Sequence, residues 1–270
     1  MSPLIPIASP DDPRIDAYHA IRERDLVGRA GRFIVEGRTV LDVALSPRNR
    51  FPLDSLLLAE SRVEALAPLL AQAPEGLPIY TAGQAVLDGI TGFHIHRGLL
   101  GIGRRGPEAD AAALMAELPE RATVLVVSGV SNHDNIGGIF RNAAAFGADA
   151  VLLDTASCDP LYRKAIRVSV GGALMVPFAR GGAIDTLLDL VVAHGFTPLA
   201  LTPAGALDLA DCRPPPRTAL LLGAEGPGLP PRIMERTLTV RIPMRGNFDS
   251  LNVATAAGIA LHHVTAIHAR

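Results

Sequence analysis

The chain has 270 residues, of which 49% are hydrophobic and 19% charged, and its mean hydropathy is positive. This composition excludes an intrinsically disordered chain, and the length allows one large or two ordinary domains. A formal net charge of −2 and an aromatic content of 4% do not predict the basic or aromatic-lined surface typical of nucleic-acid-binding proteins.

Helix and strand patterns alternate over the first 105 residues, which indicates a compact α/β domain of three or four strands. We expect helices at 12–27, 38–45, 62–72 and 84–90, and strands at 32–36, 55–59, 77–80 and 98–102. The charged and Gly-Pro-containing sequence that follows predicts a linker at 106–120.

Residues 121–270 predict a second domain built on a parallel sheet. Continuous apolar runs, typical of strands buried on both faces, lie at 123–127, 150–153, 197–201, 219–222 and 238–242. Helical patterns separate them at 136–146, 160–168, 184–193 and 252–268. The predicted fold class is therefore α/β. No G-x-G-x-x-G follows the first of these strands, so an oxidoreductase that binds a dinucleotide is disfavoured.

The remaining general features concern charge and cellular location. Residues 14–50 contain eight arginines against five acidic residues, which is either solvated surface charge or a local basic patch. Cys158 and Cys212 lack metal-ligand spacing and form no disulfide framework. The N-terminal residues do not resemble a signal peptide, and no uninterrupted apolar run reaches about 18 residues. We expect a cytoplasmic protein with no membrane segment and no metal.

The helix expected at 136–146 begins with an unusual combination of residues. Asn135 precedes it, and its first turn contains Gly137 and Gly138, although glycine costs about 1 kcal/mol relative to alanine inside a helix. Two such glycines indicate the close approach of another backbone or of a ligand. Arg141 lies on the same, otherwise apolar helix, where an arginine is either a surface charge or a functional group.

Two loops that follow predicted strands also have unusual chemistry. The sequence LLGAEGPGL at 221–229 permits close backbone approach to a ligand, although a tight strand-to-helix turn would also explain its glycines. It lacks the G-K-[ST] of a phosphate loop. After the strand at 238–242, Ser250 and Asn252 flank Leu251 at the start of a small-residue helix. A helix N-cap, worth about 1 kcal/mol, explains one of these polar residues but not both.

These three segments, in this order, resemble the three motifs of the SpoU/TrmH family of RNA ribose methyltransferases, within the SPOUT superfamily. The matched residues are Asn135, Gly137, Arg141, Ala143 and Gly147, then Leu222, Gly223, Glu225, Gly228 and Leu229, then Ile242, Pro243, Met244, Gly246, Ser250, Leu251, Asn252 and Val253. One departure is Asn132-His133, where the family commonly has Asp-Pro. Residues 1–105 resemble, more loosely, the family's small ribosomal-protein-like domain that binds the RNA substrate.

The resemblance implies a trefoil-knot fold for residues 121–270 and S-adenosylmethionine as the cofactor. It implies a cofactor pocket built from three loops, with binding residues Leu201, Thr202, Pro203, Leu222, Gly223, Glu225, Gly226, Ile242, Met244 and Leu251. It implies an active site containing Asn135, Arg141, Glu225, Ser250 and Asn252. A guanidinium stays protonated at physiological pH, so we expect Arg141 to clamp a phosphate and stabilise negative charge rather than act as a base.

The resemblance also implies the substrate and the assembly. We expect a homodimer that methylates a ribose 2′-hydroxyl in RNA, with ribosomal RNA favoured over transfer RNA because of the added N-terminal domain. A non-catalytic RNA-binding member of the family is the other alternative. Arg163, Lys164 and Arg167 form either an RNA-phosphate contact or a solvated helix face. The residues at 245 and 247–249 match no motif position and have no predicted role.

Overall fold

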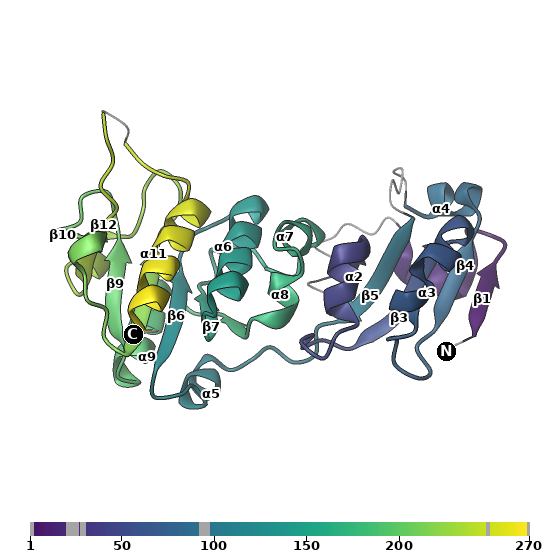
Figure 1. Ribbon diagram of the computed structural model, residues 1–270, viewed down its shortest axis with the longest axis horizontal. Helices are drawn as coiled ribbons and strands as arrows, with labels where there is room; N and C mark the ends of the chain where they lie inside the picture. The colour runs from purple at the N-terminus through teal and green to yellow at the C-terminus, as the bar shows by residue number, and fades with distance from the viewer. Residues whose placement is uncertain (1–2, 20–26, 28–30, 92–97, 247–248, 269–270) are drawn as a thin grey trace. The chain divides into compact units, whose positions relative to one another are not determined.

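The computed structural model describes residues 3–19, 27, 31–91, 98–246 and 249–268 (Figure 1). Its contacts divide the chain into two compact units. The first unit contains Met1–Pro107 and Leu161–Met175, and the second contains Glu108–Pro160 and Val176–Arg270. The chain therefore passes between the units three times. No helix in the described part of the chain combines the length and the apolar character needed to cross a membrane.

The first unit is built on a mixed five-stranded sheet of order β1-β4-β3-β5-β2, in which β5 runs antiparallel to β2 and β3. The strands are β1 (Leu4–Ile7), β2 (Arg32–Glu36), β3 (Leu53–Ala59), β4 (Ile79–Ala82) and β5 (Leu99–Arg104). The helices are η1 (Pro13–Tyr18), α2 (Arg38–Ala44), η2 (Glu60–Arg62), α3 (Val63–Leu70), α4 (Gln84–Thr91), α7 (Arg163–Val168) and α8 (Gly172–Met175). Leu56, Leu57 and Leu58 of β3 are fully buried at the centre of this sheet.

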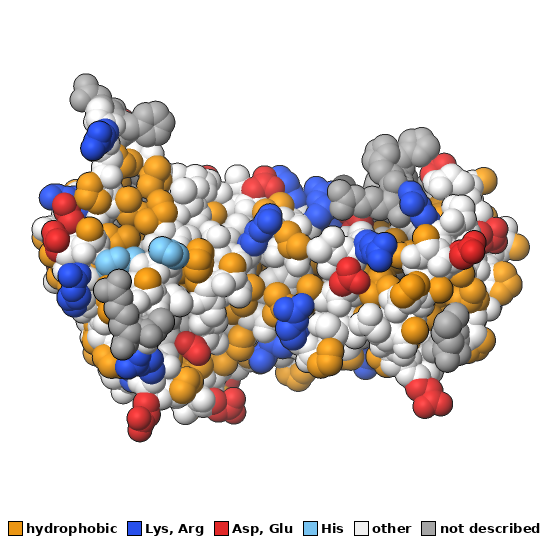
Figure 2. Space-filling view, in the orientation of Figure 1, with side chains coloured by type: hydrophobic (Ala, Val, Ile, Leu, Met, Phe, Trp, Pro, Cys, Tyr) orange, Lys and Arg blue, Asp and Glu red, His pale blue; other side chains and the backbone are white. Residues whose placement is uncertain are grey.

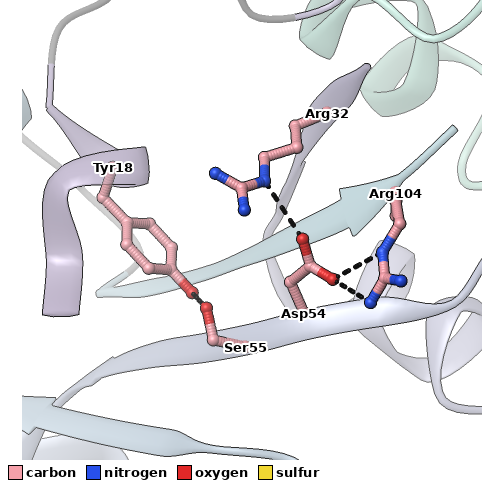
Figure 3. A network of polar contacts seen from close by, with 5 residues as sticks. All are labelled: Tyr18, Arg32, Asp54, Ser55 and Arg104. Atoms are coloured by element: carbon pink, nitrogen blue, oxygen red, sulfur yellow. Dashed lines mark hydrogen bonds and ion pairs between the residues drawn. The ribbon is translucent and has the colours of Figure 1, made fainter. Parts of the chain in front are cut away.

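The helix expected at 12–27 is confirmed at its start, but as the short 3₁₀ helix η1 that ends before the extended residue His19, so one continuous helix is wrong. Residues 20–26 lie outside the described part of the chain, and Val27 is helical. A 3₁₀ helix repeats every three residues, so Ile15 and Tyr18 both face the core. The Tyr18 hydroxyl is 2.8 Å from Ser55 Oγ (Figure 3), and burial raises the pKa of Tyr18 well above its usual range.

The second unit has a seven-stranded sheet of order β10-β12-β9-β11-β6-β7-β8, and every pair in it is parallel. The strands are β6 (Ala122–Val127), β7 (Ala150–Leu153), β8 (Phe178–Arg180), β9 (Thr197–Leu201), β10 (Leu207–Asp208), β11 (Arg217–Leu222) and β12 (Leu238–Arg241). The helices are α5 (Ala111–Ala116), α6 (His133–Phe146), α9 (Ile184–Ala193), η3 (Leu209–Asp211), α10 (Pro231–Met234) and α11 (Val253–His268). The α/β class with a parallel sheet is confirmed, whereas the trefoil knot stays a prediction.

Helices α6 and α11 pack side by side in the second unit (Figure 1). A Cβ atom at Gly138 would lie 2.6 Å from the Ala254 Cβ, so only glycine lets α11 approach this closely. One turn further along α6, Asn142 Nδ2 donates a hydrogen bond of 2.6 Å to the Ala254 carbonyl oxygen. The close approach that the sequence predicts for the glycines of α6 is thus confirmed at Gly138, and the approaching element is α11.

Candidate active site

A cavity of about 330 Å³ lies beside the carboxyl ends of β9, β11 and β12 in the second unit. Its size is that of a small-molecule site, and most of its lining is apolar. The lining residues are Leu201, Thr202, Pro203, Leu222, Gly223, Ala224, Glu225, Gly226, Gly228, Val240, Ile242, Met244, Ser250, Leu251, Asn252, Val253 and Ala256. Figure 2 shows hydrophobic side chains gathered below the segment that leads into α11. Every residue predicted to hold the cofactor is among these lining residues.

The loop after β11 doubles back on itself at the wall of the cavity. The Gly228 N–H donates a hydrogen bond of 3.0 Å to the Ala224 carbonyl oxygen, and Gly226 and Gly228 have φ values of 83° and 69°. A Cβ atom at Gly223 would lie 2.3 Å from the Gly228 carbonyl carbon. The tight turn is therefore confirmed, because the close contact at Gly223 is with the loop's own backbone, whereas close approach to a ligand stays a prediction.

Asn135 connects the two loops that carry the second and third motifs. It lies in the first turn of α6 and is only 4% exposed. Its side-chain Nδ2 donates a hydrogen bond to Glu225 Oε1, and its Oδ1 accepts one of 2.7 Å from Asn252 Nδ2. Three predicted active-site residues, distant in the sequence, thus form one hydrogen-bonded group at the cavity.

Asn252 also caps α11, as the alternative interpretation of this residue predicts. Its Oδ1 accepts hydrogen bonds from the Ala254 N–H at 3.0 Å and the Thr255 N–H at 3.2 Å. The cap fixes the orientation of the Asn252 amide, which in turn fixes that of Asn135. Each amide in this group therefore donates to the next: Asn252 donates to Asn135, and Asn135 donates to Glu225, where the chain of hydrogen bonds ends. The exposed Glu225 carboxylate is therefore the acceptor that the group presents to the cavity.

Asp154, at the end of β7, holds the loop that leads into α6. Its buried carboxylate accepts hydrogen bonds from Ser128 Oγ at 2.7 Å, from the Gly129 N–H at 3.1 Å, and from Ser157 N and Oγ at 2.8 and 2.7 Å. Gly129 adopts a φ of 68°, and a Cβ atom there would lie 3.1 Å from the Ala224 Cβ. The sequence does not reveal this role, because Asp154 matches no motif.

The other two predicted active-site residues lie in different settings. Ser250 is exposed and lines the cavity next to Leu251. Arg141 lies on the exposed face of α6, outside the cavity lining, and pairs with no residue in the described part of the chain. The structure therefore groups Asn135, Glu225, Ser250 and Asn252 at the cavity and leaves Arg141 facing solvent.

Of the residues without a predicted role, Arg245 and Asp249 are exposed, and those at 247–248 lie outside the described residues. Within the described residues, no cluster of three or more His, Cys, Asp and Glu side chains has the arrangement of a metal site.

Comparisons with known proteins show which family the chain resembles. A family model described as the SpoU rRNA Methylase family matches residues 122–262. An uncharacterized tRNA/rRNA methyltransferase of Mycobacterium tuberculosis is 40% identical, over 96% of this chain and 91% of the relative. The 23S rRNA (guanosine-2′-O-)-methyltransferase RlmB of Acinetobacter baylyi is 33% identical, over 70% of this chain and 78% of the relative.

A solved structure has the same fold over nearly the whole length. The SpoU methyltransferase AviRb of Streptomyces viridochromogenes, solved in complex with AdoMet, aligns with a TM-score of 0.80 and 23% identity, over 96% of this chain and 99% of that one. The family model spans more than half of this chain, and the relatives span most of it. The chain belongs to the SpoU family of RNA methyltransferases.

Proposed function

We propose that this enzyme methylates a ribose 2′-hydroxyl in ribosomal RNA and takes the methyl group from S-adenosylmethionine. The observation that carries the proposal is the cavity in which Glu225, linked through Asn135 to Asn252, stands beside the apolar lining. The RlmB relative, which is named as a 23S rRNA 2′-O-methyltransferase, supports the substrate class.

The residues of the cavity fit the proposed cofactor. Leu201, Leu222, Ile242 and Leu251 offer apolar surface for an adenine ring, and Gly223 contributes backbone to the same lining. The Glu225 carboxylate suits the hydroxyl or amino groups of such a ligand. When bound, S-adenosylmethionine supplies a methyl group already activated by its sulfonium, so the protein must chiefly orient the ribose and manage the hydroxyl proton.

We assign roles to the polar residues on this basis. Asn135 and Asn252 hold Glu225 and the start of α11 in place, and Ser250 is positioned to contact the ribose. Arg141 presents its guanidinium to solvent, where it is free to bind the phosphate next to the target ribose and stabilise developing negative charge.

The role of Arg141 has a direct test. Arg141→Ala should abolish methyl transfer without changing the affinity for S-adenosylmethionine, because Arg141 lies outside the cavity lining. Arg141→Lys activity that follows the affinity for RNA would support the phosphate clamp. Near wild-type turnover by Arg141→Ala would contradict the role.

The substrate class is tested with radiolabelled S-adenosylmethionine and two unmodified transcripts, 23S ribosomal RNA and a transfer RNA pool. We expect label in the ribosomal transcript, located at a 2′-O-methyl nucleotide by resistance to alkaline hydrolysis. Label confined to transfer RNA would favour the second candidate, which the names of the tRNA/rRNA methyltransferase relatives leave open.

We also propose a homodimer. Ile259 on α11 is 41% exposed beside the small residues of the same helix, which gives a second copy an apolar face for close packing. Light scattering should find a dimer, and Ile259→Asp should convert it to a monomer. A wild-type monomer at micromolar concentration would contradict the proposal.

A further inference from the structure

We propose that the first unit carries a strip of arginines along β2 that binds the phosphate backbone of the RNA substrate. The strip consists of Arg32, Arg104, Arg163 and Arg167, gathered as two pairs around Asp54 and Glu36. This inference rests on the proposed function, and it adds a second point of contact with the same RNA.

The first pair surrounds Asp54 (Figure 3). Arg32 Nε donates a hydrogen bond of 3.1 Å to Asp54 Oδ2, and Arg104 donates to Asp54 Oδ1 from Nε at 2.9 Å and from Nη2 at 2.6 Å. Arg32 and Arg104 are register partners on β2 and β5, so they lie on the same face of the sheet. A register irregularity between Leu53 and Ser55 places Asp54 between them, as β-bulges re-aim side chains.

The second pair lies at the other end of β2. Arg163 Nε and Arg167 Nη1, both on α7, are 3.8 and 3.6 Å from Glu36 Oε2. Glu36 lies four residues after Arg32 on the same strand, so both point to the same face and are separated by roughly 13 Å. The two pairs therefore stand in line on one face of the first unit.

The first pair has an excess of one positive charge, because the Arg32 and Arg104 guanidiniums share the Asp54 carboxylate. The ion pairs of Arg14 with Asp12, Arg232 with Asp185 and Arg241 with Asp208, by contrast, each match one arginine with one acid. Holding two guanidiniums together is electrostatically unfavourable unless an anion occupies the space between or beside them. The strip is therefore a local positive surface on a chain whose net charge is −2.

The arginines of the first pair keep donors available. The side chains of Arg32 and Arg104 are 46% and 60% exposed, whereas that of Asp54 is 18% exposed beneath them. The Nη groups of Arg32 have no partner among the described residues, since its only bond to Asp54 uses Nε. A planar guanidinium with free N–H groups suits the bidentate recognition of phosphate.

The same contacts also have a structural role, which the test must separate from RNA binding. The side chains of Asp54 and Glu36 are only 18% and 11% exposed, so each double variant leaves a part-buried carboxylate without its cations and should lower the melting temperature. RNA affinity is therefore measured at a temperature at which thermal unfolding shows each variant to be folded. This makes the strip testable with the full chain.

The test compares Arg32→Gln/Arg104→Gln and Arg163→Gln/Arg167→Gln with wild type, and uses Arg14→Gln as the matched control. Arg14 lies in the same unit, is 48% exposed and belongs to a one-to-one ion pair. The probe is the unmodified 23S ribosomal RNA transcript, and its dissociation constant is measured over a series of KCl concentrations. Thermal unfolding and S-adenosylmethionine binding verify that each variant is folded.

We expect each double variant to weaken RNA binding about tenfold and to reduce the slope of log affinity against log salt by about 1 for each lost phosphate contact. Arg14→Gln should leave that slope unchanged. The strip would be contradicted, with the proposed function left intact, by wild-type salt slopes in both double variants. An equal loss of RNA affinity in Arg14→Gln would contradict it in the same way. A wild-type chain that binds S-adenosylmethionine but neither binds nor methylates any RNA would contradict the proposed function as well.

Discussion

Asn135 is the residue on which the geometry of the candidate site depends most. It is buried, and both ends of its amide are used, one by Glu225 and the other by Asn252. Asn135→Ala would leave Glu225 and the Asn252 amide without this partner. We expect turnover to fall about a hundredfold, because the groups would lose their preorganised arrangement, and the free energy of unfolding to fall by about 1–3 kcal/mol.

Steady-state methylation kinetics and thermal unfolding check this prediction. Asn142→Ala is the control, since Asn142 lies on the same helix and loses one hydrogen bond to the Ala254 carbonyl oxygen without touching the cavity. It should lower stability with a much smaller effect on turnover. Equal turnover in the two variants would show that Asn135 acts only through the packing of α6.

The two cysteines should react slowly in the folded protein. Burial, helped by the charge of Asp159, raises the pKa of the Cys158 thiol to about 11, and burial also raises the pKa of Cys212. A pKa that rises from 9.0 to about 11 lowers the Cys158 thiolate fraction at pH 8 about a hundredfold, and the thiolate is the reactive form. Titration with a chromogenic disulfide should therefore be slow until denaturant is added, and should accelerate as the pH is raised. Rapid native reaction at pH 8 would contradict this.

Among the elements, the contact between α6 and α11 is sensitive to a single methyl group. Gly138→Ala would improve helix propensity by about 1 kcal/mol, yet its Cβ would collide with that of Ala254. We expect a net loss of about 1–3 kcal/mol in stability, because α11 would have to move. The double variant Gly138→Ala/Ala254→Gly should recover part of the loss in chemical denaturation, and the absence of recovery would locate the strain elsewhere.

The sequence predicts the long elements of this fold better than the short ones. Strands β6 and β7 are nearly continuous apolar runs, and the structure buries every residue in them. Their hydrophobic pattern was therefore sufficient to predict them as buried strands. Strand β1 escaped prediction because Pro6 interrupts its four residues, and β10 is only two residues long. Such strands form because a neighbouring strand offers hydrogen bonds, which a local pattern does not reveal.

For the candidate site, the sequence could predict most of the active-site residues but only some of the contacts between them. The motif spacing predicts Asn135, Glu225 and Asn252 as active-site residues, and the structure connects them by hydrogen bonds. That Asn252 is at once a cap and a link could not be predicted, since the link depends on α6 lying beside α11. The role of Asp154 could not be predicted either, because it depends on β6 pairing with β7, which brings Ser128 and Gly129 of the loop after β6 to its carboxylate.

At the scale of the whole molecule, the segment Leu161–Met175 belongs to the first unit although it lies between two parts of the second. Its helix α7 packs against β2, and the Arg50 N–H donates a hydrogen bond of 3.0 Å to the Leu174 carbonyl oxygen. A fragment that begins at residue 108 would lack these partners. We expect limited proteolysis to cut this fragment within 161–175, and a separately produced fragment of residues 1–107 to restore protection when added. A resistant fragment on its own would contradict the assignment.

Because the first unit is made of two separate segments, it also constrains how related enzymes can exchange this unit. A single crossover at residues 106–120 would replace β2 and α2 but leave the old α7 and α8 facing new, unmatched surfaces. A functional chimera therefore needs two exchanges, one before residue 108 and one that carries Leu161–Met175 with it. Any exchange of the first unit between relatives, whether engineered or by natural recombination, has to move both segments together.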